Sequence, residues 1–302
     1  MRRLLKWLGI GVAGLAIVVA LASGGVVVVF KRAMAQVHDV AVDPLAIPTD
    51  EASIAEGARL VKARGCAECH GPDLGGRYAV EDPVLGRIWA PNITPGSGSA
   101  VEGYRVEDWV RAVRHGVKRD GTPTILMPAD ELFFLDDREL GAIIAYLQRA
   151  PVVDRERKPH EFEPLLYVLG VTGQFPLFTT NDMDHGAPRP ASVDPAPTAA
   201  FGAYLARIQC TGCHGAGLGG GPFPGAPPSL PVPANLTPDP QTGLGGWTEA
   251  EFSRALREGR RPDGRELDPF MPWKTYSHLD ETEVAALWAY LQSIPAKPFG
   301  SR

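Results

Sequence analysis

Cysteine is scarce in this chain, and several kinds of protein are excluded by what the sequence lacks. Only four of the 302 residues are cysteines, and because two short motifs use all of them, no disulfide is expected. Basic charge is not in excess either, since 30 Lys and Arg stand against 35 Asp and Glu, which disfavours nucleic-acid binding. The 34 Gly and 29 Pro indicate long loops rather than dense regular structure. The length suits two modest domains with additional segments.

The four cysteines lie in the runs Cys66-Ala67-Glu68-Cys69-His70 and Cys210-Thr211-Gly212-Cys213-His214. A C-x-x-C-H run is the attachment motif of c-type haem, in which the two thiols bond to the haem vinyl groups and the His ligates the iron. Two cysteines three residues apart lie on neighbouring turns of a helix and can reach one edge of the porphyrin. The sequence therefore predicts two covalently bound haem c groups, attached through Cys66, Cys69, Cys210 and Cys213, with His70 and His214 as iron ligands.

A C-x-x-C pair also occurs in zinc sites and in thioredoxin-like dithiols. Zinc would require two such pairs, or one pair with nearby His residues, in a single place, whereas these pairs are 144 residues apart. A thioredoxin-like dithiol requires a βαβ pattern around the motif, and none is visible. A zinc or dithiol module stays as an alternative that a pyridine haemochrome assay separates from haem.

The sequence repeats itself with a period of about 144 residues. Asn92-Ile93-Thr94-Pro95 corresponds to Asn235-Leu236-Thr237-Pro238, and Met127-Pro128 corresponds to Met271-Pro272. The chain has only five Met, yet each of these two lies 57 residues after the His of its own repeat. A lone Met usually fills a gap in a core, but equal spacing in both repeats favours Met127 and Met271 as second axial ligands. An iron with both faces filled carries electrons and binds no substrate.

Helices are expected on both sides of each motif. The helix before it is predicted over 53–63 and 198–208, and a closing helix with one apolar face follows each Met. Asp136 or Asp137 and Asp280 are expected to cap the closing helices. The Asn and Thr of the repeated Asn-x-Thr-Pro runs are expected in a haem-pocket loop, bonding backbone or propionate. Solvated or loop roles are expected for the other histidines, which do not recur at matching positions: His38, His115, His160, His185 and His278.

The N-terminal segment contains the one long apolar run, 23 uncharged residues from Leu8 to Phe30. As a helix it would span roughly 35 Å, enough for a hydrocarbon core of about 30 Å. A cleavable signal peptide has an apolar core of only ~7–15 residues, so the length favours a retained anchor. Ala33-Met34-Ala35 nevertheless fits a cleavage site, which leaves removal after Ala35 open.

The charges that flank this run predict its orientation. Three basic residues precede it (Arg2, Arg3 and Lys6), two follow it (Lys31 and Arg32), and no acid lies in residues 1–35. The excess of positive charge places the N-terminus in the cytoplasm. The expected location is a single pass through the bacterial inner membrane, with residues 36–302 in the periplasm, where c-type haem is attached in bacteria.

Residues 152–198 interrupt the repeat. Seven prolines exclude a long helix there, but apolar runs such as Leu165-Leu166-Tyr167-Val168-Leu169 favour a segment that packs along both domains. Contact with the membrane surface or a partner is the alternative. The predicted organisation is an anchor over 1–35, domains over 36–151 and 199–302, and a Pro-rich packed linker over 152–198.

The repeated residues resemble the membrane-anchored dihaem class I cytochromes c, and in particular the cytochrome c subunits of bacterial membrane-bound dehydrogenases. The second repeat carries most of the resemblance, in Ala234–Pro238, Gly246-Trp247-Thr248, Ala255–Gly259 and Pro269–Trp273. The resemblance implies a mainly α fold with an N-terminal transmembrane helix and two tandem class I cytochrome c domains. It also implies that Cys66, Cys69, His70 and Met127 serve one haem and Cys210, Cys213, His214 and Met271 the other.

The expected function is electron transfer between a dehydrogenase or quinol-oxidising donor and a downstream oxidase or soluble cytochrome, with no catalytic activity of its own. Residues 36–302 hold 25 basic and 35 acidic side chains, which favours docking onto basic partner surfaces. The alternative is a haem enzyme, such as a dihaem peroxidase or a thiosulfate-oxidising cytochrome, in which one iron is open or lacks a Met ligand.

Overall fold

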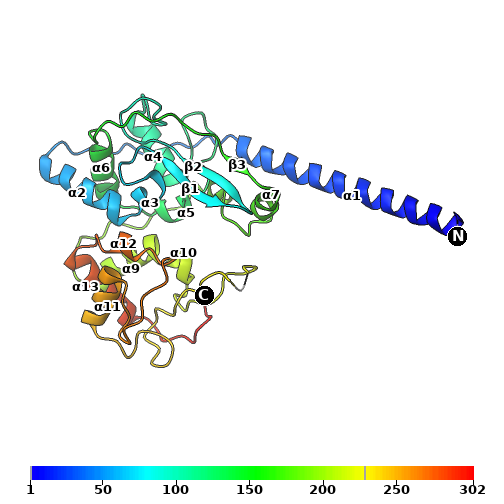
Figure 1. The fold of residues 1–302 in the computed structure, drawn as a ribbon. Helices are drawn as coiled ribbons and strands as arrows, with labels where there is room; N and C mark the ends of the chain where they lie inside the picture. The colour runs from blue at the N-terminus through cyan, green and yellow to red at the C-terminus, as the bar shows by residue number, and fades with distance from the viewer. Residues whose placement is uncertain (1, 228) are drawn as a thin grey trace.

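The structure is a computed structural model that describes residues 2–227 and 229–302. Helix α1 (Arg2–Ala35) projects from two mainly helical lobes stacked on each other (Figure 1). Among the described residues, α1 is the one helix long and apolar enough to cross a membrane. Its last turns are packed against the first lobe, so the helix and this lobe share part of a core.

The two lobes repeat one order of helices. The first contains α2 (Glu51–Ala63), α3 (Cys66–His70), α4 (Val106–His115), α5 (Ala129–Leu132) and α6 (Asp137–Leu147). The second contains α9 (Ala199–Gln209), α10 (Thr211–His214), α11 (Glu249–Glu258), α12 (Trp273–Tyr276) and α13 (Glu281–Ser293). The predicted helices before each motif and the two closing helices are thus confirmed. The predicted N-caps of the closing helices are also confirmed. The Asp136 carboxylate accepts a hydrogen bond from the backbone N–H of Arg138, and the Asp280 carboxylate accepts one from that of Glu283.

In each lobe the first helix crosses the closing helix at a glycine. A Cβ at Gly57 of α2 would lie 2.0 Å from the carbonyl oxygen of Ala142 in α6. In the second lobe a Cβ at Gly202 of α9 would lie 1.9 Å from the carbonyl oxygen of Ala286 in α13. Neither distance leaves room for a side chain, so the absence of a Cβ lets the two backbones approach this closely.

A small sheet distinguishes the first lobe. Strands β1 (Arg77–Asp82) and β2 (Gly86–Ala90) form an antiparallel hairpin, to which the short β3 (Glu161–Phe162) adds on the β2 side. No strand is predicted from the sequence in this part of the chain. The hairpin forms because β-prone side chains, among them Val80, Ile88 and Trp89, occupy both strands. The described residues of the matching stretch in the second lobe, 215–234, contain no strand.

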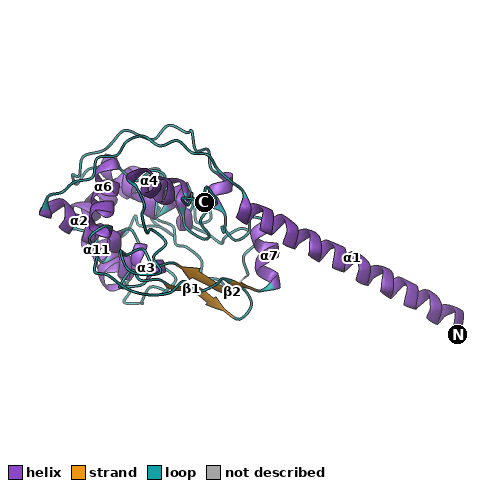
Figure 2. Ribbon diagram, turned by 90° about the horizontal axis from the view of Figure 1, so that it is seen from above, coloured by secondary structure: helices purple, strands orange, loops and turns teal. Residues whose placement is uncertain are grey.

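The segment between the lobes carries two short helices, α7 (Pro164–Val171) and α8 (Thr179–Asp182). The expectation of no long helix is confirmed. The apolar part of this segment packs mainly on the first lobe and on the end of α1, where Leu166, Leu177 and Phe178 surround Phe30. Figure 2 shows α7 at the edge of the lobe from which α1 leaves.

One residue of each lobe is buried in the core of the other lobe. Ala63, at the end of α2, is buried within the cluster of the second lobe, and Ile208, near the end of α9, is buried within that of the first. Tyr204 packs against both clusters. The stretches that lead into the two Cys motifs therefore lie at the boundary between the lobes.

Candidate haem-binding sites

Both Cys-x-x-Cys-His motifs lie on a short helical turn. Helix α3 contains the first motif from Cys66 to His70, and in the second motif Cys210 caps α10, which ends at His214. The glycine after each His has a positive φ, 86° at Gly71 and 80° at Gly215, a conformation that glycine adopts without strain. The backbone thus turns away directly after each His, and the two thiols of each motif lie on neighbouring turns, as the spacing predicted.

Each motif histidine is held by a backbone carbonyl. The Nδ1 of His70 donates to the carbonyl oxygen of Pro91 at 2.7 Å, and the Nδ1 of His214 donates to that of Ala234 at 2.7 Å. Burial lowers the pKa of both imidazoles, which favours the neutral form. A neutral imidazole whose Nδ1 is occupied presents Nε2 as its ligand atom. The two carbonyls had no signal in the sequence, because they belong to the backbone.

The surroundings of the thiols do not favour the thiolate form that a redox dithiol needs. Burial raises the pKa of Cys66 to about 11 and that of Cys210 to about 12, whereas reactive redox cysteines have a lowered pKa. Among residues 2–227 and 229–302, no three His, Cys, Asp or Glu side chains are grouped so as to hold a metal ion. The zinc and dithiol alternatives therefore gain no support from the geometry.

Met127 and Met271 have the same local surroundings. Each precedes a proline that begins a short helix, Pro128 before α5 and Pro272 before α12. The carbonyl oxygen of each Met accepts a hydrogen bond from the backbone N–H two residues later, at 2.8 and 2.7 Å. In the first lobe that of Met127 also accepts from Thr179 Oγ1 at 3.0 Å. The two thioethers are thus presented by equivalent, fixed loops.

The repeated Asn residues bond backbone. Asn92 Nδ2 donates to the carbonyl oxygen of Val153 at 2.6 Å, and Asn235 Nδ2 donates to that of Lys297 at 2.8 Å. Of the two options that the sequence left open, backbone and propionate, the structure shows the first. Each Asn ties the loop after its haem motif to the segment after the closing helix, which closes the lobe around the site.

Some buried polar atoms remain without partners among the described residues. They include Trp89 Nε1, Thr124 Oγ1 and Arg261 Nε. Trp89 precedes the carbonyl that holds His70 by two residues, and Thr124 precedes Met127 by three. Buried donors need a partner, and the carboxylates of a haem are suitable ones. The thiols, the imidazoles with free Nε2 and these atoms together fit haem c.

His115 differs from expectation. A solvated or loop role is expected from the sequence, but His115 is buried at the end of helix α4, where its ring packs edge-on against Phe133. Its Nδ1 lies 3.1 Å from Nδ1 of His185, and burial lowers its pKa to about 4. This pair could not be predicted from the sequence, because His185 comes from the distant segment between the lobes.

Comparison with known proteins agrees with this geometry. The model of the family described as "Cytochrome C oxidase, cbb3-type, subunit III" matches residues 52–147 and 197–291. The chain belongs to this cytochrome c family. Membership implies covalently bound haem c and electron transfer, and the two matches confirm the predicted tandem cytochrome c domains. They are called the first and second domain below.

Several curated relatives are named as cytochrome subunits of dehydrogenases. The chain is 26% identical over 281 residues to the fructose dehydrogenase cytochrome subunit of Gluconobacter japonicus, covering 84% of this chain and 55% of the relative. It is 28% identical to the cytochrome c subunit of the alcohol dehydrogenase (quinone) of Gluconobacter oxydans (strain 621H), with 83% and 56% covered. The gluconate 2-dehydrogenase cytochrome c subunit of Pantoea cypripedii is 28% identical, with 82% and 61% covered. The chain thus spans little more than half the length of these relatives.

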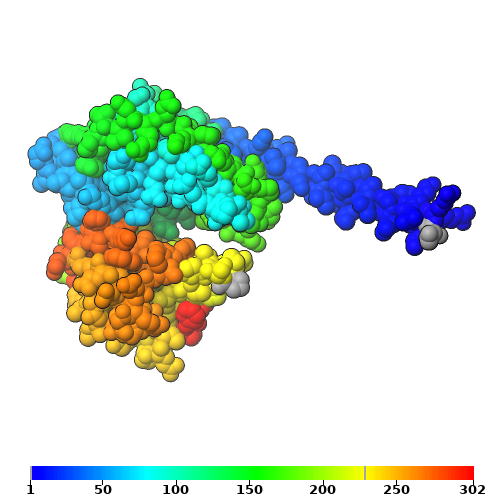
Figure 3. Space-filling model, in the orientation of Figure 1, coloured from blue at the N-terminus to red at the C-terminus, as the bar shows by residue number. Residues whose placement is uncertain are grey.

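The two Cys-x-x-Cys-His motifs lie at the interface between the domains, where their contacts are reciprocal. Glu68, between the cysteines of the first motif, accepts from Thr275 Oγ1 of α12 at 2.7 Å. At the equivalent place in the second motif, a Cβ at Gly212 would lie 1.7 Å from Oε1 of Glu131 in α5. Thr275 and Glu131 also occupy equivalent positions of the repeat. Figure 3 shows the orange segment that contains α12 against the blue segment of the first domain.

A buried charge cluster joins the domains beside the motifs. The Arg64 side chain, 1% exposed, donates to Glu139 at 2.7 and 2.9 Å and to Glu283 at 2.6 Å. Glu139 and Glu283 lie in the first turns of α6 and α13, at equivalent positions of the repeat. Two further contacts are reciprocal, because Arg59 donates to Glu283 at 2.5 Å and the hydroxyl of Tyr204 donates to Glu139 at 2.9 Å.

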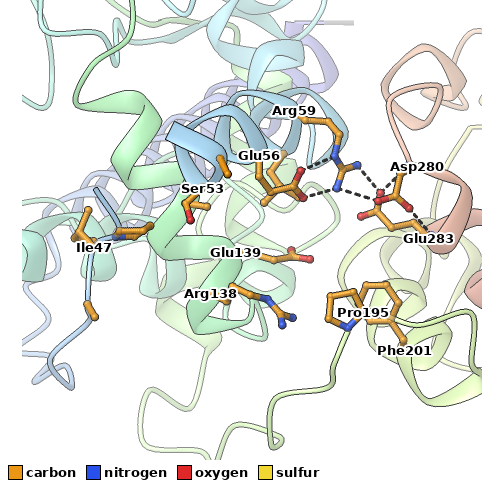
Figure 4. A pocket seen from close by; sticks show the side chains of 15 residues that line it. Ile47, Ser53, Glu56, Arg59, Arg138, Glu139, Pro195, Phe201, Asp280 and Glu283 are labelled. Atoms are coloured by element: carbon orange, nitrogen blue, oxygen red, sulfur yellow. Dashed lines mark hydrogen bonds and ion pairs between the residues drawn. The ribbon is translucent and has the colours of Figure 1, made fainter. Parts of the chain in front are cut away.

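This cluster forms one wall of an interdomain cavity of 490 Å³. Figure 4 shows Arg59 between Glu56 on one side and Asp280 and Glu283 on the other, with Pro195 and Phe201 below. Burial lowers the pKa of Arg64, but the two carboxylates outweigh it and leave that pKa above the ordinary value. Arg64 therefore keeps its charge at neutral pH, and its bonds to Glu139 and Glu283 join the two domains.

Proposed function

We propose that this chain is a dihaem electron carrier of the bacterial inner membrane. The observation that carries the proposal is that two equivalent Cys-x-x-Cys-His motifs lie at one domain interface, each against the short helix that follows Met127 or Met271 of the other domain. Electron transfer falls steeply with distance, so attachment segments that share an interface favour transfer within the chain. Each haem supplies a one-electron change at its iron, and the protein residues hold it in place.

The proposed roles divide equally between the domains. Cys66 and Cys69 attach the first haem, and Cys210 and Cys213 attach the second. His70 and His214 offer Nε2 to the irons, because Nδ1 is held by a carbonyl in each case. Met127 and Met271 supply the sixth ligands. Filling both faces of each iron leaves it no place for a substrate, which favours a carrier over the alternative haem enzyme.

Helix α1 is proposed to be a retained membrane anchor, with the rest of the chain in the periplasm. The packing supports retention, because Phe30, Ala33 and Met34 contribute to a core shared with the first domain. Cleavage after Ala35 would remove the fully buried Phe30 ring from that core. The greater number of basic residues before the run than after it supports a cytoplasmic N-terminus.

A membrane-bound dehydrogenase is the proposed electron donor, and an oxidase or soluble cytochrome is the proposed acceptor. Support for the donor comes from the relatives, which are named as cytochrome subunits of fructose, alcohol and gluconate dehydrogenases. A quinol-oxidising complex is the other candidate donor. Co-purification from mildly solubilised membranes identifies which of them binds.

Methionine variants test the carrier proposal. In the purified, haem-loaded chain, Met127→Ala and Met271→Ala should each convert one haem of two to a high-spin form that binds carbon monoxide. Met183→Ala is the matched control, because Met183 lies in the linker outside both repeats, and it should leave both haems low-spin. Stoichiometric carbon monoxide binding at either haem of the unmutated protein would refute the carrier and favour the enzyme.

A further inference from the structure

Helix α7 contains no charged side chain, and Tyr167 carries its only side-chain polar group, although one side of the helix faces solvent. Its sequence is Pro-Leu-Leu-Tyr-Val-Leu-Gly-Val. Leu166 is buried beside Phe30, and the Tyr167 ring lies 4.6 Å from the Phe30 ring, so this side of the helix packs on α1. Leu165 and Val168 point the other way and are 42% and 44% exposed. A short surface helix normally carries charge on its outer face, and α7 does not.

The position of α7 along α1 is set by Phe30. Phe30 is the last residue of the uncharged run and is followed by Lys31 and Arg32. The run is about 35 Å long as a helix, against a hydrocarbon core of about 30 Å, so Phe30 lies near the boundary between acyl chains and headgroups when α1 spans. Because α7 packs against Phe30, it lies at the same depth. Figure 2 shows α7 on the face of the first domain from which α1 departs.

The tip of the β1–β2 hairpin extends this apolar face. The backbone N–H of Glu163, the residue before α7, donates to the carbonyl oxygen of Leu85 at 3.2 Å, which holds the tip against the start of the helix. Val84, at the tip, is 54% exposed. The name α7 patch is used below for Val84, Leu165 and Val168. Asp82 and Glu163 lie at its rim, so it offers no basic cluster for anionic headgroups.

We propose that the α7 patch is a second membrane contact, which lies in the boundary between headgroups and acyl chains of the lipid into which α1 inserts. The inference rests on the proposed anchoring by α1. The α7 patch is covered by lipid, because it continues the apolar surface of α1 at the depth where the membrane-spanning part of α1 ends. Two contacts on separate segments fix the orientation of the first domain on the membrane, whereas α1 alone would let the helix and the domain packed on its end tilt together relative to the lipid.

Photocrosslinking in the full-length, haem-loaded protein tests the contact. A benzophenone amino acid replaces Leu165 or Val168, and the protein is placed in phosphatidylcholine nanodiscs. The same replacement at Leu15 of α1, 65% exposed, is the positive control, and that at Val232 of the second domain, 50% exposed, is the negative control. Mass spectrometry after irradiation measures the fraction of each protein that carries a lipid adduct. An unchanged haem spectrum verifies that each variant is folded.

Lipid adducts at positions 15, 165 and 168, at least fivefold above those at 232, support the proposal. Adducts at 15 with none at 165 and 168 overturn it, as do crosslinks from 165 or 168 to a second protein copy in place of lipid. Equal yields at 165, 168 and 232 overturn it as well. Absence of adducts at 15 refutes the anchor itself, so failure of the proposed function is distinguished from failure of the patch.

Discussion

Replacement of Arg64 by methionine should separate the energetic role of the interdomain cluster from that of ordinary surface ion pairs. The change keeps an unbranched, apolar side chain and removes the charge that Glu139 and Glu283 share. Removing one partner of a buried ion pair costs about 3–5 kcal/mol, because the other charge stays buried. Glu283 keeps Arg59, and Glu139 keeps the Tyr204 hydroxyl, so the low end of that range is expected. A loss of about 3 kcal/mol lowers the folding equilibrium constant more than a hundredfold.

The matched control is Arg87→Met in the first domain. Arg87 pairs with Glu81 at 3.0 Å and with Glu161 at 3.4 Å, but its side chain is 42% exposed. Exposed pairs contribute at most about 1 kcal/mol. Guanidinium unfolding of the full chain in detergent, followed by circular dichroism and Soret absorbance, measures both free energies. Equal, small losses for Arg64→Met and Arg87→Met would show that the cluster contributes nothing beyond a surface pair.

The same cluster predicts a dependence on pH. Burial raises the pKa of Glu283, but the charge of Arg64 and the bonds from Arg59 outweigh it, so the folded pKa lies below the ordinary 4.5. A carboxyl whose pKa is lowered by folding contributes stability above its unfolded pKa and loses that contribution as pH falls. The contribution should therefore be full at neutral pH and disappear on acidification below about 4.5. In Arg64→Met this part of the acid dependence should be reduced; an unchanged acid profile would contradict the assignment.

Three further substitutions give distinct readouts. Phe30→Ala should lower the free energy of unfolding by about 3–5 kcal/mol, because it leaves a cavity where the buried ring packs. The same guanidinium unfolding measures this loss. Val29→Ala, on the exposed side of α1, should change the free energy of unfolding little. Gly202→Ala should destabilise the second domain by about 1–3 kcal/mol, because the added methyl group would clash with the backbone of α13. The loss is measured as a lowered Tm. Gly246→Ala is the control, because a Cβ at Gly246 has no atom within 4 Å, and it should leave the Tm unchanged. Burial, and then the neighbouring Asp130, raise the pKa of Glu131 to about 7 beside the second attachment motif. Its ionisation stabilises the ferric haem, so the second reduction potential should fall as pH rises through about 7, and a potentiometric titration of Glu131→Gln should show that slope removed.

The repeat accounts for most of what the sequence could predict. Helix periodicity and capping depend on residues close in the chain, so Asp136 and Asp280 were identified as possible caps without a structure. The β1–β2 hairpin was missed because its strands are short and the second repeat has no counterpart to reveal it. The equal spacing of Glu139 and Glu283 is visible in the sequence, but their shared contact with Arg64 depends on how the domains dock. Nothing in local sequence encodes that docking.

The exchange of Ala63 and Ile208 between the two cores has a consequence for dissecting this molecule. A fragment with the first repeat alone would lack the Ile208 side chain in its core and would expose Ala63. A fragment with the second repeat alone would lack Ala63 in its core and would expose Ile208. It would also lose both reciprocal hydrogen bonds, because Arg59 to Glu283 and Tyr204 to Glu139 each join one domain to the other. Single-repeat fragments should thus aggregate or recombine into pairs. We therefore expect the two repeats to fold together, and we expect truncation alone not to give a stable half-length carrier.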